Sequence, residues 1–268
     1  RHSLAAVSSS SYGYFGGGFA PPFNNQDTIN HIDFSNETIS SVTATLSQAR
    51  YGLAAVSSSS YGYFGGGSNP FSSPNYVNTI DRIDFSNETT SAPGENLPQG
   101  REYLAAVSGG ASERIKGSRT YGYFGGGSPS PDGRIDRIDF SNETTSEPGN
   151  NLPQPRTALA AVSSSSYGYF GGGNAPPRVT TVDRIDFSNE TTSAPGNDLS
   201  QERQGLAAVS SSAYGYFAGG YLSPPVTYAD TVDRIDFSNE TTSAPGNNLT
   251  QARASLSGTS SNSYGYFG

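Results

Sequence analysis

The stretch LAAVSSSSYGYFGGG, from Leu53 to Gly67, joins a small apolar run, a serine turn and an aromatic run that ends in three glycines. Small polar residues between two β-prone runs favour a hairpin, so it predicts one strand over 53–56 and a second over 61–64. A phosphate-binding loop is not indicated, because the glycines do not follow the G-x-G-x-x-G pattern and no P-loop lysine is present. We expect them to end the strand and let the backbone pass close to its neighbours.

The aromatic run recurs along the chain, with its first tyrosine at positions 12, 61, 121, 167, 214 and 264. The spacings are 49, 60, 46, 47 and 50 residues, and the longest contains an insertion, SGGASERIKGSRT, between Val107 and Tyr121. Each of the first five aromatic runs is followed by a variable stretch and then by IDFSNET. In the second repeat this part predicts a third strand over 79–85 and a fourth over 89–92, which Pro93 and Gly94 end.

Four short strands in each repeat, and no capped segment with helical periodicity, predict an all-β fold. Repeats of this size are typical of β-propellers built from four-stranded antiparallel blades. We expect the alanine strand innermost and the aromatic strand between blades. The prediction is a single domain over residues 1–268, part of a longer protein, with five complete repeats of 46–60 residues and a half repeat at 253–268. Six blades with the last one incomplete are favoured, and five blades are the alternative.

The ordered features of each repeat resemble a known family. An Arg, a small apolar strand, a turn, an aromatic strand ending in Gly-Gly, a variable loop, VDRIDFSNET and LPQ before the next Arg are similar to the kelch repeat, although the chain lacks the Trp expected in the outer strand. The near-identical sequences of the repeats also resemble tandem kelch-like proteins of marine phages, especially those of cyanobacteria. The resemblance implies a kelch-like propeller.

Composition restricts the classes of function. The formal net charge is −8, which argues against nucleic acid as a partner, and no apolar run approaches the roughly 20 residues that span a bilayer, so membrane insertion is not expected. With no Cys and only two His, no cofactor or metal is expected, and the chain has few of the side chains that act as catalytic nucleophiles or bases. The prediction is therefore a protein that is not an enzyme. A glycoside hydrolase that uses only carboxylates is the enzymatic alternative.

Two polar motifs recur with the strands. The Asp-Arg-x-Asp pattern, as in Asp183, Arg184 and Asp186, is interpreted as a structural network between blades, because an active site is needed once and buried charges need partners. The Asn-Glu-Thr triplets match the N-glycosylation acceptor, and turn preference also explains them.

The loops between the second and third strands vary most and are expected to share one rim with the loops that join the repeats. Their aromatic, amide and basic side chains are candidates for binding a ligand or partner: Phe23, Asn24, Phe71, Asn75, Tyr76, Arg178, Tyr221 and Tyr228. Capping of the blades is the alternative role for these aromatics. The insertion is expected at the opposite rim as a partner-docking loop, through Glu113, Arg114, Lys116 and Arg119.

These observations predict a non-enzymatic interaction or structural module, extracellular or virion-associated, for example in a phage tail fibre. Its partner would be a host glycan or protein bound at the variable rim. A purely structural subunit that self-assembles edge to edge through its incomplete blade, into a fibre or oligomer, is the alternative.

Overall fold

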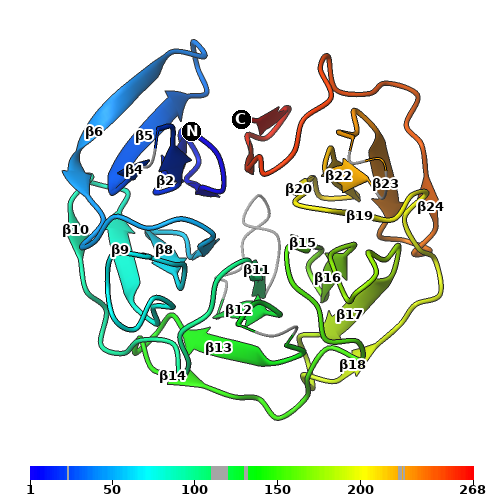
Figure 1. Ribbon diagram of the computed structural model, residues 1–268, viewed down its shortest axis with the longest axis horizontal. Coiled ribbons are helices and arrows are strands. Elements are labelled where there is room, and N and C mark those ends of the chain that lie inside the picture. Colours follow the sequence, from blue (N-terminus) through cyan, green and yellow to red (C-terminus); the bar gives the residue numbers. More distant parts are fainter. Residues whose placement is uncertain (23, 110–119, 130–131, 223–224, 226) are drawn as a thin grey trace.

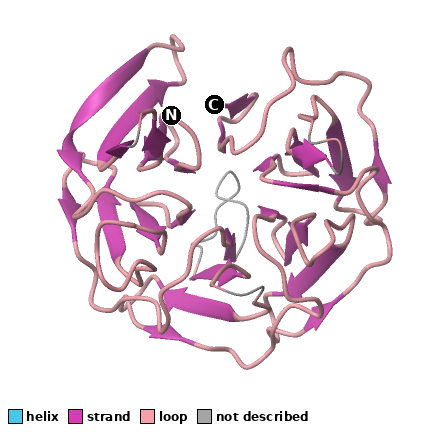
Figure 2. Cartoon of the chain, viewed as in Figure 1, coloured by secondary structure: helices cyan, strands magenta, loops and turns pink. Residues whose placement is uncertain are grey.

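The computed structural model is a β-propeller in which five four-stranded antiparallel sheets surround a central axis (Figures 1 and 2). Its described residues form only strands and loops. The structure describes residues 1–268 except 23, 110–119, 130–131, 223–224 and 226. The predicted fold class is thereby confirmed. Each sheet follows the order of the chain from the axis outward, so that the alanine strand is innermost as expected.

The five blades are numbered in chain order. Blades 1 and 2 contain β1 (Ala5–Ser8), β2 (Tyr12–Gly16), β5 (Thr28–Asp33) and β6 (Ile39–Thr45), then β7 (Ala54–Ser57), β8 (Tyr61–Gly65), β9 (Ile80–Asp84) and β10 (Thr90–Ser91). Blade 3 contains β11 (Ala105–Gly109), β12 (Tyr121–Gly125), β13 (Ile135–Asp139) and β14 (Thr145–Ser146). Blades 4 and 5 contain β15 (Ala160–Ser163), β16 (Tyr167–Gly171), β17 (Val182–Asp186) and β18 (Thr192–Ser193), then β20 (Ala207–Ser210), β21 (Tyr214–Ala218), β23 (Val232–Asp236) and β24 (Thr242–Ser243).

Short ribbons in the loops add two small sheets. They pair β3 (Phe19–Ala20) with β4 (Asn24–Asn25), and β19 (Arg203–Gln204) with β22 (Tyr221–Leu222).

The strand boundaries in the second repeat differ from the prediction by one or two residues. The first two strands begin or end one residue later, and the third covers 80–84 rather than 79–85. The fourth strand is only Thr90–Ser91, because its pairing with β9 stops before the Pro-Gly pair that ends it. In blade 1 the sequence ISSVTAT replaces this Pro-Gly segment, and β6 continues for seven residues with an irregular register against β5.

The sixth repeat forms a hairpin, β25 (Gly258–Ser260) and β26 (Gly265–Phe267), at a sixth position between blades 5 and 1 (Figure 1). The Thr259 hydroxyl donates a 3.3 Å hydrogen bond to the Val7 carbonyl, and the Ser260 hydroxyl donates a 3.2 Å bond to the Ser210 carbonyl. The ring therefore has five four-stranded blades, as in the alternative prediction, and a two-stranded sheet at the place favoured for an incomplete sixth blade.

The hydrophobic core lies between the blades. One cluster joins Val7 and Tyr14 of blade 1 to Leu53, Phe64 and Ile83 of blade 2, and the three other junctions between complete blades repeat this arrangement. Burying each such side chain stabilises the fold by roughly 1.5–3 kcal/mol. A Cβ on Gly16 would lie 2.8 Å from the Phe64 ring, so the glycine of the aromatic strand makes room for the next blade.

A buried ion pair ties the inter-repeat loop before each of blades 2–5 to the third strand of that blade. The guanidinium groups of Arg50 and Arg156 lie 2.8 Å from the carboxylates of Asp81 and Asp183, and both arginines are fully buried. Arg101 with Asp136, and Arg203 with Asp233, form the equivalent pairs. In blade 1 the neutral Asn30 replaces the aspartate, and its Oδ1 accepts a 2.7 Å hydrogen bond from Arg1.

Adjacent blades are also joined by a second contact, through the glutamate of Asn-Glu-Thr. Glu143 of blade 3 accepts hydrogen bonds from Tyr63 (3.0 Å) and Arg82 (2.6 Å) of blade 2. Its counterparts accept equivalent bonds from the preceding position: Glu88 from Tyr14, Glu190 from Tyr123 and Arg137, Glu240 from Tyr169 and Arg184, and Glu37 from Tyr266. These glutamates have positive φ, between 57° and 60°.

Each charged residue of the Asp-Arg-x-Asp pattern therefore makes a different contact. In blades 2–5 the first aspartate pairs with the buried arginine of its own repeat. In blades 2–4 the pattern's arginine donates to the glutamate of the next blade. The last aspartate folds the turn locally, since Asp84 accepts hydrogen bonds from the backbone N–H and the hydroxyl of Ser86. Asn87 Oδ1 likewise accepts bonds from Thr89, so this asparagine has a role in the turn.

Candidate binding rim

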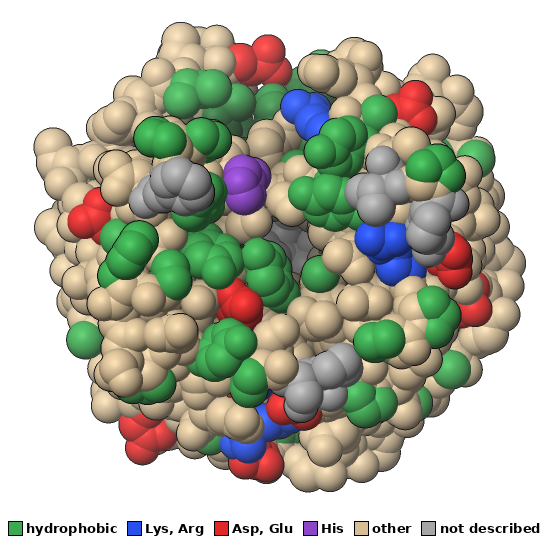
Figure 3. Space-filling view, viewed as in Figure 1, with side chains coloured by type: hydrophobic (Ala, Val, Ile, Leu, Met, Phe, Trp, Pro, Cys, Tyr) green, Lys and Arg blue, Asp and Glu red, His purple; other side chains and the backbone are tan. Residues whose placement is uncertain are grey.

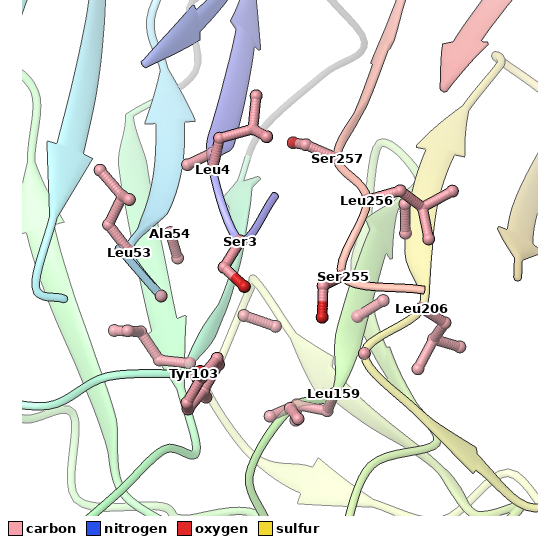
Figure 4. Close-up of a pocket in the computed structure, with 18 of the residues that line it drawn as sticks. Ser3, Leu4, Leu53, Ala54, Tyr103, Leu159, Leu206, Ser255, Leu256 and Ser257 are labelled. Carbon is pink, nitrogen blue, oxygen red and sulfur yellow. The ribbon is translucent and has the colours of Figure 1, made fainter. Parts of the chain in front are cut away.

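One end of the propeller carries both the variable loops and the loops between repeats. Figure 3 shows one face of the ring, where hydrophobic side chains surround a central hollow. A cavity of about 550 Å³ opens at the start of the innermost strands, lined by a leucine from every repeat and by alanines from the first five (Figure 4). Leu4, Leu53, Leu159, Leu206 and Leu256 come from five different repeats and surround the same space.

The mouth of the cavity is framed by a closed ring of backbone hydrogen bonds, which we call the collar. Its members, one from each repeat, are Ser3, Gly52, Tyr103, Ala158, Gly205 and Ser255, all with φ between 53° and 65°. Each donates its N–H to the carbonyl of the preceding member, and Ser3 donates to Ser255, at 2.7 to 2.8 Å. Because every member is bonded on both sides, the collar fixes the backbone around the mouth of the cavity.

An aromatic arc extends outward from the collar. It runs from His2 to Phe19, Tyr51 and Tyr103, with ring centroids 5.4, 6.0 and 5.9 Å apart. Burial raises the pKa of the Tyr103 hydroxyl, and the nearby carboxyl of Glu102 adds to this effect, so the hydroxyl stays protonated and can donate. Tyr103 lines the cavity together with polar groups such as Ser3 and Gln204.

Glu102 is a buried carboxyl group at the base of the arc. Burial raises its pKa, while hydrogen bonds from Ser68 and Tyr51 oppose the rise. Its Oε2 atom is buried without a hydrogen-bond partner among the described residues.

The predicted rim residues occupy four blades and are only partly brought together. Tyr221 and Tyr228 form a bridge with ring centroids 5.4 Å apart, and Tyr221 lines the cavity. Arg178 donates a 2.8 Å hydrogen bond to the Leu222 carbonyl, so it links the loops of blades 4 and 5.

The remaining predicted residues lie farther out. Ser68 forms β-bridges with both Tyr76 and Tyr51. Asn24 and Asn75 are exposed, and Phe71 is 76% exposed. Phe23 lies outside the described residues, as do the insertion residues Glu113, Arg114, Lys116 and Arg119.

Sequence reasoning missed the aromatic arc and Glu102. Tyr51 and Glu102 directly follow the buried arginine of their repeats, where the other repeats have His2, Thr157, Gln204 and Ala254. This variation within an otherwise constant repeat was the signal in the sequence that could have pointed to a binding role, because a position that only supports the fold would be repeated unchanged.

In comparison with known proteins, no family model matches this sequence and no curated protein matches it significantly. Within the described part of the chain there is no helix able to cross a membrane and no group of three or more His, Asp or Glu side chains placed to hold a metal ion.

Proposed function

We propose that this protein is a non-enzymatic binding module whose ligand is a glycan, held at the mouth of the central cavity. The observation that carries the proposal is that Tyr103, which belongs to both the collar and the aromatic arc, lines a cavity of about 550 Å³ together with His2 and Tyr221. Small-molecule sites are concave spaces of about 300–1,000 Å³ lined by apolar and aromatic groups with a few polar groups.

The chemistry of the mouth suits a sugar. Aromatic rings offer flat apolar faces for the C–H surface of a pyranose, and tyrosine adds a polar tip. Ser3, Thr157, Gln204 and Ser255 surround the same space and supply hydroxyl and amide groups for sugar hydroxyls. The collar supports affinity because it orders the backbone at or next to these residues before binding, which reduces the entropy lost on association.

The proposal includes a kelch-type repeat and an extracellular or virion-associated location, which rest on the sequence resemblance. It is non-enzymatic because the repeated carboxylates already serve ion pairs and turns: Asp183 binds Arg156, Glu143 binds Tyr63 and Asp84 binds Ser86.

A glycan array with the purified protein tests the proposal. We expect Tyr103→Ala to lose at least about tenfold in affinity for the glycans bound by the wild type. Alanine fits there, because Ala158 occupies the equivalent collar position with φ 55°.

The matched control is Tyr264→Ala, which removes an exposed tyrosine (66%) from the serine turn of the hairpin. Absence of glycan binding by the wild type, or equal binding by both variants, would overturn the proposal. Turnover of a glycoside substrate panel would overturn its non-enzymatic part.

A further inference from the structure

The hairpin at the sixth position has a free strand edge. In blades 1–5 the aromatic strand pairs with the alanine strand on one side and with the third strand on the other, as β8 does with β7 and β9. Within the described residues β26 pairs only with β25. Figure 1 shows the hairpin, marked C, between the ribbons of blades 1 and 5 with no further strand outside it.

The side chains of blade 5 that face this edge lack the partners that their counterparts have. Tyr63 stacks on Phe140 of the next blade with ring centroids 5.2 Å apart, and it shares Glu143 with Arg82. The equivalents in blade 5 are Tyr216 and Arg234. Tyr216 is partly exposed, whereas Tyr63 is fully buried. Among the described residues, Arg234 contacts the Tyr214 ring and Ser243 but no carboxylate.

Arg253 is the third side chain near this edge that lacks the partner of its counterparts. It corresponds to the buried arginines that pair with an aspartate of the third strand, as Arg156 does with Asp183. Arg253 is only partly buried and forms no ion pair within the described residues, whereas Arg156 is fully buried and paired.

Blades 3–5 define what satisfies such a set of groups. One segment supplies an aspartate to the arginine, a phenylalanine to the tyrosine ring, and a glutamate to the tyrosine hydroxyl and second arginine. In blade 3 these are Asp136, Phe140 and Glu143, a D-x-x-x-F-x-x-E spacing along one strand and its turn.

We propose that the edge of β26 is a binding site for a β-strand segment with this D-x-x-x-F-x-x-E chemistry, which adds antiparallel to β26 and completes a sixth blade. By analogy with β8 and β9, the aspartate lies opposite Phe267 and the residue before the phenylalanine lies opposite Tyr264. Main-chain bonds supply affinity, and the three side chains supply specificity. The occupant is a segment not yet folded into a blade, because every copy within this ring is already paired. The site is separate from the proposed glycan site.

A synthetic peptide with the sequence of residues 231–245 (TVDRIDFSNETTSAP) is the probe, titrated into the whole protein by fluorescence anisotropy. We expect saturable one-to-one binding, with amide protons of 264–268 becoming protected from exchange. Peptides carrying Asp233→Asn, Phe237→Ser or Glu240→Gln should each bind at least about tenfold more weakly, since each loses a charge-assisted bond or a ring contact.

Variants of the protein test the same contacts from the other side. Arg234→Gln should weaken binding of the unmodified peptide about tenfold and should not further weaken the Glu240→Gln peptide. The matched control, Arg184→Gln, changes an arginine whose glutamate is already present in blade 5, and should leave peptide binding unchanged.

Three outcomes would overturn the proposal. They are no saturable binding, equal binding of a scrambled peptide, and a dimer of this chain through the edge that the peptide does not dissociate.

Discussion

The hydroxyl of Tyr63 donates a 3.0 Å hydrogen bond to Glu143 Oε1, a residue of the next blade. The same carboxylate is 2.6 Å from Arg82, so one glutamate holds two side chains of the neighbouring blade. Burial, and then the charge of Glu143, raise the pKa of the Tyr63 hydroxyl, which keeps it a donor.

Removal of this acceptor should loosen one blade junction. We expect Glu143→Ala to lower the free energy of unfolding by about 2 kcal/mol, because a hydrogen bond to a charged group is lost and Arg82 is left unpaired. Urea denaturation measures the change. The control is Glu147→Ala, which removes a half-exposed partner of Arg134 and should cost less than about 1 kcal/mol. Equal losses in the two variants would contradict a special role for Glu143.

The buried pair of Arg156 and Asp183 should be costly to break and cheap to replace. Arg156→Met leaves the Asp183 carboxylate buried and unpaired, which we expect to destabilise the fold by about 3–5 kcal/mol. The double variant Arg156→Met with Asp183→Leu should recover most of that loss, since no charge remains buried. Thermal and urea unfolding of the single and double variants test this, and a double variant no more stable than Arg156→Met would refute it.

The contact between glycine and phenylalanine at each junction should not tolerate a methyl group. A Cβ on Gly125 would lie 2.8 Å from the Phe170 ring, so Gly125→Ala should lower the free energy of unfolding by about 1–3 kcal/mol. Gly94→Ala is the control, because the nearest atom to its Cβ would lie 3.6 Å away. The fifth repeat itself has Ala218 at this position, next to the hairpin rather than to a complete blade. A neutral Gly125→Ala variant would show that the junction can shift.

The outer turns should make stability depend on acid pH. Hydrogen bonds from the hydroxyl and N–H of the serine two residues later lower the pKa of Asp33, Asp84, Asp186 and Asp236 below 3.8. A carboxyl group with a lowered pKa in the folded state contributes stability that is complete above its unfolded pKa and is lost as pH falls through the folded value.

The matched test compares the wild type with a variant in which Ser35, Ser86, Ser188 and Ser238 are alanine. Urea unfolding at about pH 6 and about pH 2.5 should show a smaller acid-induced loss in the variant. A loss as large as that of the wild type would place the pH dependence elsewhere.

Local pattern was enough to predict the propeller. The apolar, turn and aromatic runs of Leu53–Gly67 depend on neighbours in the same repeat, and the predicted strands agree with β7 and β8 within one residue. The glycan-site candidates were harder, because the collar brings together one residue from each of six repeats and no single repeat contains the signal. The role of Glu143 was missed for the same reason, since its partners lie in another blade.

The collar also has a consequence for the evolution of this sequence. In a closed ring of equivalent bonds no repeat is structurally first, so Ser3 and Ser255 meet just as Gly52 and Tyr103 do. A circular permutant that opens in another serine turn would retain the same collar bonds. Individual rim loops are then free to diverge independently, because the collar bonds are the same whichever repeat carries which loop.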